Sequence, residues 1–231
     1  MRFYQNLSKF MAFTLAEVLI TLGIIGIVAA VTIPTIMHKY YEHQTVARLK
    51  ETYSILAQAL KSLDDDYGSL DTWGITGYNE ESAKIIAEKL KTVIKIANDC
   101  GTNDEMGNCI SIENYKYLNN AHTIAYAKNT NYYKLSLMNG SSIIIKGHDV
   151  PTGQTDFKIA SFMIDTNGKD KPNMWGKDFF EIDYIPDSGL ILDGNPNKGV
   201  TDYREKGNCE KGGKGWGCAY YVVTFGKMDY L

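Results

Sequence analysis

One loop of this 231-residue chain is rich in the side-chain oxygens that bind hard metal ions. It contains Asp165, Asn167 and Asp170, and Asp178 follows it closely. Carboxylate and amide oxygens are the ligands that calcium prefers. The loop is not an EF-hand, because glycine stands at its fourth rather than its sixth place and Gly176 occupies the twelfth, where an EF-hand has glutamate. The residues therefore predict either a calcium site of these four side chains or an ordinary Asx or glycine turn.

Four cysteines form two short sequence loops, Cys100 to Cys109 and Cys209 to Cys218. Their spacing contains no C-x-x-C pair of the kind that binds zinc. Four cysteines allow three pairings, and local pairing within each loop is the simplest. Such disulfides would place the domain in an oxidising compartment outside the cytosol. Four reduced, buried cysteines are the alternative.

Motifs for catalysis and for nucleic-acid binding are missing from the sequence. It contains no Gly-x-Ser-x-Gly or His-Glu-x-x-His motif, and the glycine-rich stretch 203–217 lacks the P-loop pattern. The net charge of -3 shows no strong basic excess. We therefore predict a protein that is not an enzyme and does not bind nucleic acid.

The apolar stretch from Phe13 to Ile33 is long enough to span a membrane, yet it contains Glu17. Arg2 and Lys9 precede it without any acid, so the positive-inside rule places the leader in the cytoplasm and the rest of the chain outside. A cleaved secretory signal ending near residue 30 is the competing interpretation. Glu17 argues against that, because an acid at membrane depth is costly and a disposable signal does not need one.

The residues around this acid carry a family resemblance. Ala12 followed by Phe13-Thr14-Leu15-Ala16-Glu17-Val18-Leu19-Ile20 resembles the prepilin cleavage and methylation signal of type IV pilins and type II secretion pseudopilins. The resemblance covers residues 1 to about 63 and implies that a prepilin peptidase cuts between Ala12 and Phe13 and methylates the new amine. Ala12 stands where the family usually has glycine, and Pro34 falls where the family often has a helix-kinking proline.

The same resemblance implies a role for Glu17 in assembly. In the family, this glutamate pairs with the terminal amine of a neighbouring subunit, so that neither charge is left alone at membrane depth. The implied partners are further copies or other pilin-like subunits, the prepilin peptidase and the inner-membrane assembly platform. The implied location is the bacterial inner membrane, with a single pass, a cytoplasmic N-terminus and a periplasmic or extracellular domain. The pseudopilin resemblance also favours a calcium loop near the end of the domain.

Periodicity predicts the elements that position these residues. Spacings of three and four residues predict an amphipathic helix that serves as the spine of a domain rather than as a coiled coil, with its apolar stripe formed by Val46, Leu49, Tyr53, Leu56, Leu60 and Leu63. Pro34 should bend or locally open the preceding helix near Ala30 to Ile33.

Beyond Gly68 the pattern is that of an α+β domain. Asn79 can cap a second helix over 80–98. Alternating apolar residues around Asn139-Gly140 predict a hairpin over 133–145. Further strands are expected at 157–164 and 178–185, with 189–192 pairing back.

The sequence therefore predicts an α+β, pilin-like chain in which a long N-terminal helix packs on a C-terminal antiparallel sheet. Its parts are a leader at 1–12, a helix at 13–63 with a membrane and assembly segment at 13–33, and an extracytoplasmic domain at 64–231. The expected function is that of a structural subunit of a type II secretion pseudopilus or a type IV pilus. One alternative is a monomeric tethered domain that binds calcium or carbohydrate. Another is a secreted enzyme, for which no catalytic constellation is present.

Overall fold

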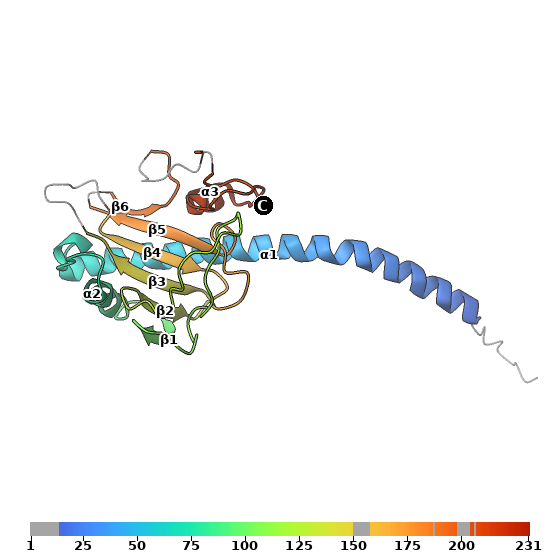
Figure 1. Ribbon diagram of the computed structural model, residues 1–231, viewed down its shortest axis with the longest axis horizontal. Coiled ribbons are helices and arrows are strands. Elements are labelled where there is room, and N and C mark those ends of the chain that lie inside the picture. The colour runs from blue at the N-terminus through green and yellow to red at the C-terminus, as the bar shows by residue number, and fades with distance from the viewer. Residues whose placement is uncertain (1–13, 150–157, 187, 198–203, 206) are drawn as a thin grey trace, which may run out of the picture. The chain divides into compact units, whose positions relative to one another are not determined.

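The computed structural model describes residues 14–149, 158–186, 188–197, 204–205 and 207–231, so the predicted cleavage residues Ala12 and Phe13 lie outside the described part. The chain divides into two compact units, Met1–Tyr41 and Glu42–Leu231. The elements labelled in Figure 1 are α1 (Leu15–Tyr67), α2 (Glu80–Leu90), β1 (Ile96–Gly101), β2 (Tyr133–Leu137), β3 (Ser142–Gly147), β4 (Ala160–Asp165), β5 (Phe179–Ile185), β6 (Gly189–Leu192) and α3 (Cys218–Phe225). A short 3-10 helix, Leu70–Thr72, follows α1.

The first part of α1 is helical without interruption, including at Pro34. Proline lacks a backbone N–H and so removes one hydrogen bond from the helix. Of the two predicted effects, a bend or a local opening near Ala30 to Ile33, the opening does not interrupt the helix, because these residues remain helical.

The second part of α1 is the predicted spine of the domain. Leu49, Leu56 and Leu63 are completely buried, and they belong to the same core cluster as Phe162 and Ile182 of the sheet. This confirms the predicted apolar stripe, whose spacing places all its members on one side of the helix.

The sheet is a six-stranded antiparallel meander in the order β1-β2-β3-β4-β5-β6. The predicted hairpin is present as β2 and β3, with the backbone N–H of Leu137 donating to Ser141 O at 2.8 Å and Gly140 at a φ of 83°. Such a positive φ is accessible to glycine without a steric penalty, which explains the Asn-Gly turn. The predicted strands β4, β5 and β6 are also present, and β6 pairs back on β5 as expected.

The second helix is shorter than the predicted 80–98. The Asn79 side chain accepts a hydrogen bond from Ser82 N at 2.9 Å, which confirms the predicted cap, but α2 ends at Leu90. The residues from Ile96 onward instead form β1, because pairing with β2 satisfies their backbone at the edge of the sheet. Helix α3 was not predicted.

Both faces of the sheet are covered. Side chains on both sides of its strands are therefore buried. One face packs on α1 and α2, while the other carries a second cluster that includes Tyr115, Ile144, Met163 and Phe179. Since alternate residues of a strand point to opposite faces, the central strands β3, β4 and β5 contribute to both clusters.

Candidate functional site

The segment of α1 within the first compact unit is apolar and exposed. Among the described residues, α1 is one helix that is long and apolar enough to cross a membrane, and none of its most apolar window is buried by the chain itself. Large apolar side chains such as Leu15, Ile20 and Ile27 are exposed. Exposure of this much contiguous apolar surface marks a contact with lipid or with another protein.

Glu17 caps the first turn of this helix. Its Oε2 accepts hydrogen bonds from Thr14 N and Thr14 Oγ1, both at 2.8 Å, while Glu17 N donates to Thr14 Oγ1 at 3.2 Å. This is the reciprocal capping box that a Thr-x-x-Glu sequence forms. The sequence reasoning missed it, although the signal, Thr14-Leu15-Ala16-Glu17, was present in the residues that carry the resemblance.

The predicted oxygen-rich loop connects β4 to β5, and an acid lies at each end of it. Asp165 ends β4, and Asp178 directly precedes β5. The backbone N–H of Thr166 donates to Asp178 O at 2.8 Å, which brings the two ends of the loop together. Neither acid has any measurable exposure.

Each acid is held by specific hydrogen bonds. Asp178 accepts the backbone N–H groups of Asn173 and Met174, at 2.8 and 2.6 Å. The hydroxyl of Tyr115 donates to Asp165 Oδ2 at 2.6 Å, and Asn167 N donates to Asp165 Oδ1 at 3.2 Å. The loop is therefore folded around its own carboxylates.

Burial of two neighbouring carboxyl groups makes their simultaneous ionisation unfavourable. Burial raises the pKa of Asp178 to about 6, even though its backbone donors act in the opposite direction. Burial and the nearby Asp178 raise the pKa of Asp165 well above its usual value. A bound divalent cation would remove this conflict, because it would neutralise both groups.

The other predicted ligands, Asn167 and Asp170, differ in their burial. The Oδ1 atoms of Asn167 and Asn173 are buried and have no hydrogen-bond partner among the described residues, so they are available as ligands. Asp170 is exposed, and it does not join Asp165 and Asp178 in a group whose ligand atoms lie within 4.8 Å of one another in the described part of the chain. Asp165, Asn167 and Asp178 therefore remain candidate calcium ligands, and the buried Oδ1 of Asn173 is a further candidate that the sequence reasoning did not include.

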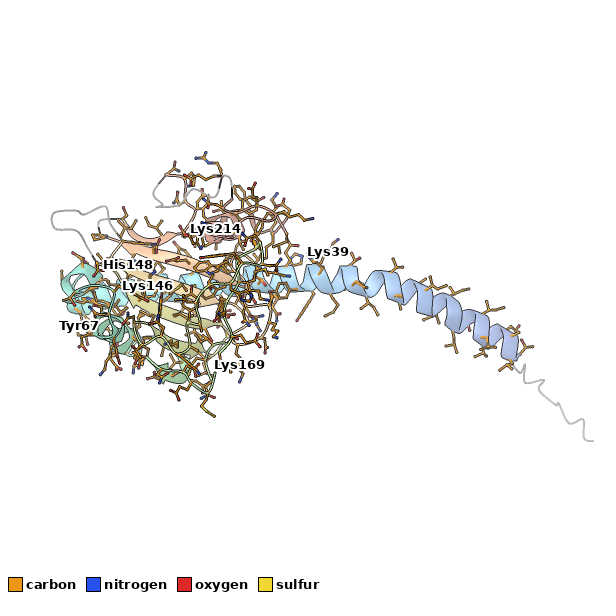
Figure 2. The ribbon with its side chains drawn as sticks, viewed as in Figure 1. Lys39, Tyr67, Lys146, His148, Lys169 and Lys214 are labelled. Carbon is orange, nitrogen blue, oxygen red and sulfur yellow. A yellow bond between two sulfur atoms is a disulfide. The ribbon has the colours of Figure 1, made fainter. Side chains whose placement is uncertain are left out.

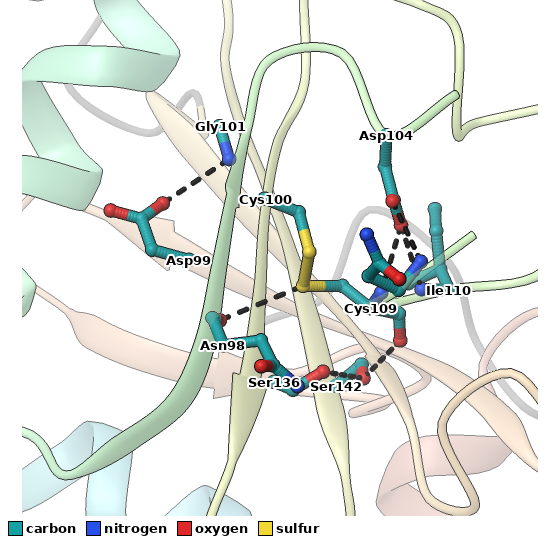
Figure 3. The surroundings of a disulfide bond; sticks show 10 residues. Asn98, Asp99, Cys100, Gly101, Asp104, Cys109, Ile110, Ser136 and Ser142 are labelled. Atoms are coloured by element: carbon teal, nitrogen blue, oxygen red, sulfur yellow. Dashed lines mark hydrogen bonds between the residues drawn. A yellow bond between two sulfur atoms is a disulfide. The ribbon is translucent and has the colours of Figure 1, made fainter. Parts of the chain in front are cut away.

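The two disulfides join Cys100 to Cys109 and Cys209 to Cys218, as the local pairing predicted. Figure 3 shows the first, where the Asp104 carboxylate accepts the backbone N–H groups of Asn108, Cys109 and Ile110 at 2.8 to 3.1 Å. The loop is fixed by these bonds as well as by its disulfide.

A second polar cluster, which the sequence reasoning missed, lies on the sheet face opposite α1. It contains His148, Lys158, Ser161, Glu181 and Asp183. The ring nitrogen Nε2 of His148 lies 2.7 Å from Ser161 Oγ, and Ser161 Oγ donates to Asp183 Oδ1. His148 is labelled in Figure 2. The available signal was the pair of acids at alternate positions of an otherwise apolar strand, since alternate positions share a face.

The electrostatics of this polar cluster are dominated by burial. Burial, with Lys146 and Lys158, lowers the pKa of His148 to about 3, so its ring is neutral. Ligand atoms of His148, Glu181 and Asp183 lie within 4.8 Å of one another, which is close enough to reach one ion. The ammonium group of Lys158 already supplies positive charge there, 3.4 Å from Glu181 and 3.2 Å from Asp183, so the cluster does not require a metal.

Comparison with known proteins concerns mainly the outer domain. A family described as a family of unknown function (DUF6613) matches residues 35–214. The chain belongs to this family. The match begins directly after Pro34, so it does not include the N-terminal residues that carry the pilin resemblance. No curated protein and no solved structure matches the chain.

Proposed function

We propose that the chain is a pilin-like structural subunit that a prepilin peptidase processes and that then polymerises into a type II secretion pseudopilus or a type IV pilus. The observation that carries this proposal is the position of Glu17 near the start of an exposed apolar helix, four residues after Phe13. An acid at this position is costly in a helix that only anchors a protein.

The continuity of α1 supports the proposal. One helix runs from the apolar segment into the core of the folded domain, where its buried residues include Val46, Leu49, Leu56, Leu60 and Leu63. An element of this kind can transmit an assembly contact to the domain that it carries. The glycines at 23 and 26 add support, because a Cβ atom at either position would meet nothing within 4 Å in the chain, and small residues allow close helix packing in lipid.

The proposed location is the bacterial inner membrane, with the N-terminus in the cytoplasm and the domain outside it. The two disulfides favour such an oxidising compartment. The proposed partners are other copies or pilin-like subunits, the prepilin peptidase and the inner-membrane assembly platform. We propose no catalytic activity and no nucleic-acid partner.

A second candidate function is that of a tethered calcium-binding domain. The buried pair Asp165 and Asp178, together with the unpartnered oxygens of Asn167 and Asn173, favours calcium binding. This candidate differs from the first only in the role of the N-terminal helix, since a subunit of a filament can also bind calcium. Carbohydrate binding has no comparable observation in its favour.

Processing of the leader tests the proposal directly. The full chain is produced with a prepilin peptidase, and its mature N-terminus is identified by mass spectrometry. We expect an N-methylated Phe13. Ala12→Gly should be cut equally well, while the bulky Ala12→Leu should remain uncut. A mature terminus at Val31 would instead identify an ordinary secretory signal, and an uncut wild-type chain would also contradict the proposal.

A further inference from the structure

Lys158, Glu181 and Asp183 bring an amine and two carboxyl groups together on the sheet face opposite α1. Lys158 precedes β4 by two residues, while Glu181 and Asp183 stand at alternate positions of β5 and so share a face. Lys158 Nζ lies 3.3 and 3.2 Å from the two carboxyl oxygens of Asp183. It is therefore almost equally distant from both oxygens of this carboxyl group. Glu181 Oε1 lies 3.4 Å from the same nitrogen.

The three side chains are shielded from solvent. Their exposed fractions are 18% for Lys158, 11% for Glu181 and 4% for Asp183. The hydroxyl of Ser161 donates to Asp183 Oδ1 and so fixes the orientation of that carboxyl group. This is not the arrangement of a serine hydrolase, because the serine lies between the histidine and the aspartate rather than at the end of the series.

Amide formation between an amine and a carboxyl group requires a protonated carboxyl, a neutral amine and a group that carries protons between them. Burial and the neighbouring Glu181 raise the pKa of Asp183 to about 7, so a large fraction of this group is protonated at neutral pH. Burial opposes ionisation of Glu181, but Lys158 and Lys146 outweigh it and lower its pKa to about 2. Glu181 is therefore the ionised carboxylate that can accept a proton, and protonated Asp183 is the electrophile.

The scarcity of neutral Lys158 amine limits the rate of the reaction. Burial opposes its charge, but Glu181 and Asp183 outweigh burial and raise its pKa above the usual value. The ammonium form predominates, so the neutral amine forms only when a proton moves to Glu181. One reaction per molecule is sufficient, and groups held in contact gain a high effective concentration.

We propose that Lys158 and Asp183 form an intramolecular isopeptide bond, with Glu181 as the proton carrier. A proton passes from the Lys158 ammonium to Glu181, and the neutral Nζ attacks Cγ of protonated Asp183. The Nζ–Cγ bond forms, a Cγ–O bond breaks, and the hydroxyl leaves as water with a second proton from Nζ. Glu181 remains protonated, and nothing is oxidised or reduced. The product is neutral, so the reaction replaces a buried ion pair, which is costly to desolvate, with an amide.

The chain provides its own comparison in Lys91. This lysine also contacts a glutamate and an aspartate, Glu88 at 2.6 Å and Asp99 at 2.7 Å. Those carboxyl groups have exposed fractions of 50% and 35%, so they lack the shielding from water that the Lys158 cluster has. We expect an ordinary ion pair there.

The bond would close the β4–β5 hairpin, because it joins a residue before β4 to a residue of β5 across 25 positions of the chain. The loop from Asp165 to Asp178 lies inside this closed segment. Covalent closure would therefore hold the candidate calcium loop even when the sheet is under tension. The bond goes beyond the proposed function and does not depend on it.

The test is the mass of the folded full chain. After reduction of the disulfides, wild type should weigh one water less than its sequence requires, and a protease digest should contain a branched peptide that joins Lys158 to Asp183. Trypsin should not cut after Lys158. The variants Glu181→Gln and Lys158→Arg should each recover the full mass, whereas Lys91→Arg should still lack one water.

The variant Asp183→Asn provides an independent test, because it should still form the bond. It should form the same amide with loss of ammonia rather than water, and so give the same final mass as wild type. Correct pairing of both disulfides shows that each variant has folded. A folded wild type with its full mass overturns the proposal. Loss of water mapped to a cyclic imide at Asp193-Gly194, rather than to Lys158 and Asp183, overturns it equally.

Discussion

The Glu17 carboxylate accepts hydrogen bonds from both the backbone N–H and the hydroxyl of Thr14, each at 2.8 Å. The acid therefore has a partner within its own helix, and the capping box alone gives it a structural role. Pairing with the terminal amine of a neighbouring subunit needs the negative charge, whereas capping needs only an oxygen acceptor. Variants can separate the two roles.

Glu17→Gln should leave the helix capped but prevent assembly. Glutamine also forms the capping box, yet it cannot neutralise the amine of Phe13 inside a filament. Filament yield is measured after shearing, with membrane-inserted subunit as the reference. Thr14→Ala, which removes the hydroxyl and keeps the charge, is the matched control and should still assemble. Wild-type filament yield from Glu17→Gln would leave capping as the only role of this acid and favour the tethered domain.

Calcium should raise the melting temperature of the full chain. A ligand that binds only the folded state stabilises it by about 2.7 kcal/mol at a hundredfold excess over its Kd. Asp165→Asn and Asp178→Asn should each lose this response, because both acids are buried beneath the loop.

Asp170→Asn is the control for the calcium experiment, since Asp170 is exposed whereas Asp165 and Asp178 are buried. It should respond to calcium nearly as wild type does. Equal melting temperatures of wild type in calcium and in chelator would identify the loop as a turn built around Asp178.

Removal of either disulfide should lower the free energy of unfolding by about 2 to 3 kcal/mol on a loop-entropy basis. Both bonds span a sequence separation of 9, so the unfolded chain gains similar freedom in each case. The double variants Cys100→Ser/Cys109→Ser and Cys209→Ser/Cys218→Ser are compared by denaturant unfolding. We expect the smaller effect from the first pair, because Asp104 retains its three backbone hydrogen bonds in that loop. A clearly larger loss there would contradict this role of Asp104.

Because Lys134 is buried, we expect the free energy of unfolding of the domain to increase at alkaline pH. Its side chain is fully buried, and its ammonium donates to Thr102 O and Asn129 O at 2.6 and 2.7 Å. Burial lowers its pKa to about 8, although Asp104 and Glu80 act in the opposite direction. Between this pH and the usual 10.5, the unfolded chain binds more protons at this residue than the folded chain, so stability increases as pH rises.

The measurement compares wild type with Lys134→Met by denaturant unfolding at pH 7 and pH 10. Wild type should gain up to about 3 kcal/mol relative to the variant, since each pKa unit corresponds to about 1.4 kcal/mol. The exposed Lys128→Met is the control and should follow wild type. A constant difference between wild type and Lys134→Met across this range would show that the buried amine does not titrate as proposed.

The sequence by itself determined the elements whose signals are local. The apolar stripe of α1, the Asn139-Gly140 turn and the Asn79 cap each depend on residues a few positions apart, and the structure contains all three. The local disulfide pairing was predictable for the same reason. Thr14 and Glu17 were equally local, and their capping box could have been read from the sequence.

Only the tertiary structure decided which distant side chains meet. Strand β1 replaced the end of a predicted helix because β2, more than thirty residues away, offered it an edge. Asp165 meets Tyr115, and Lys158 meets Asp183, because the sheet brings separate strands into register. Their burial, and with it the pKa shifts and the chemistry that we infer, follows from packing over the whole domain. A pattern of neighbouring residues does not contain that information, because burial depends on what the rest of the chain places on top of them.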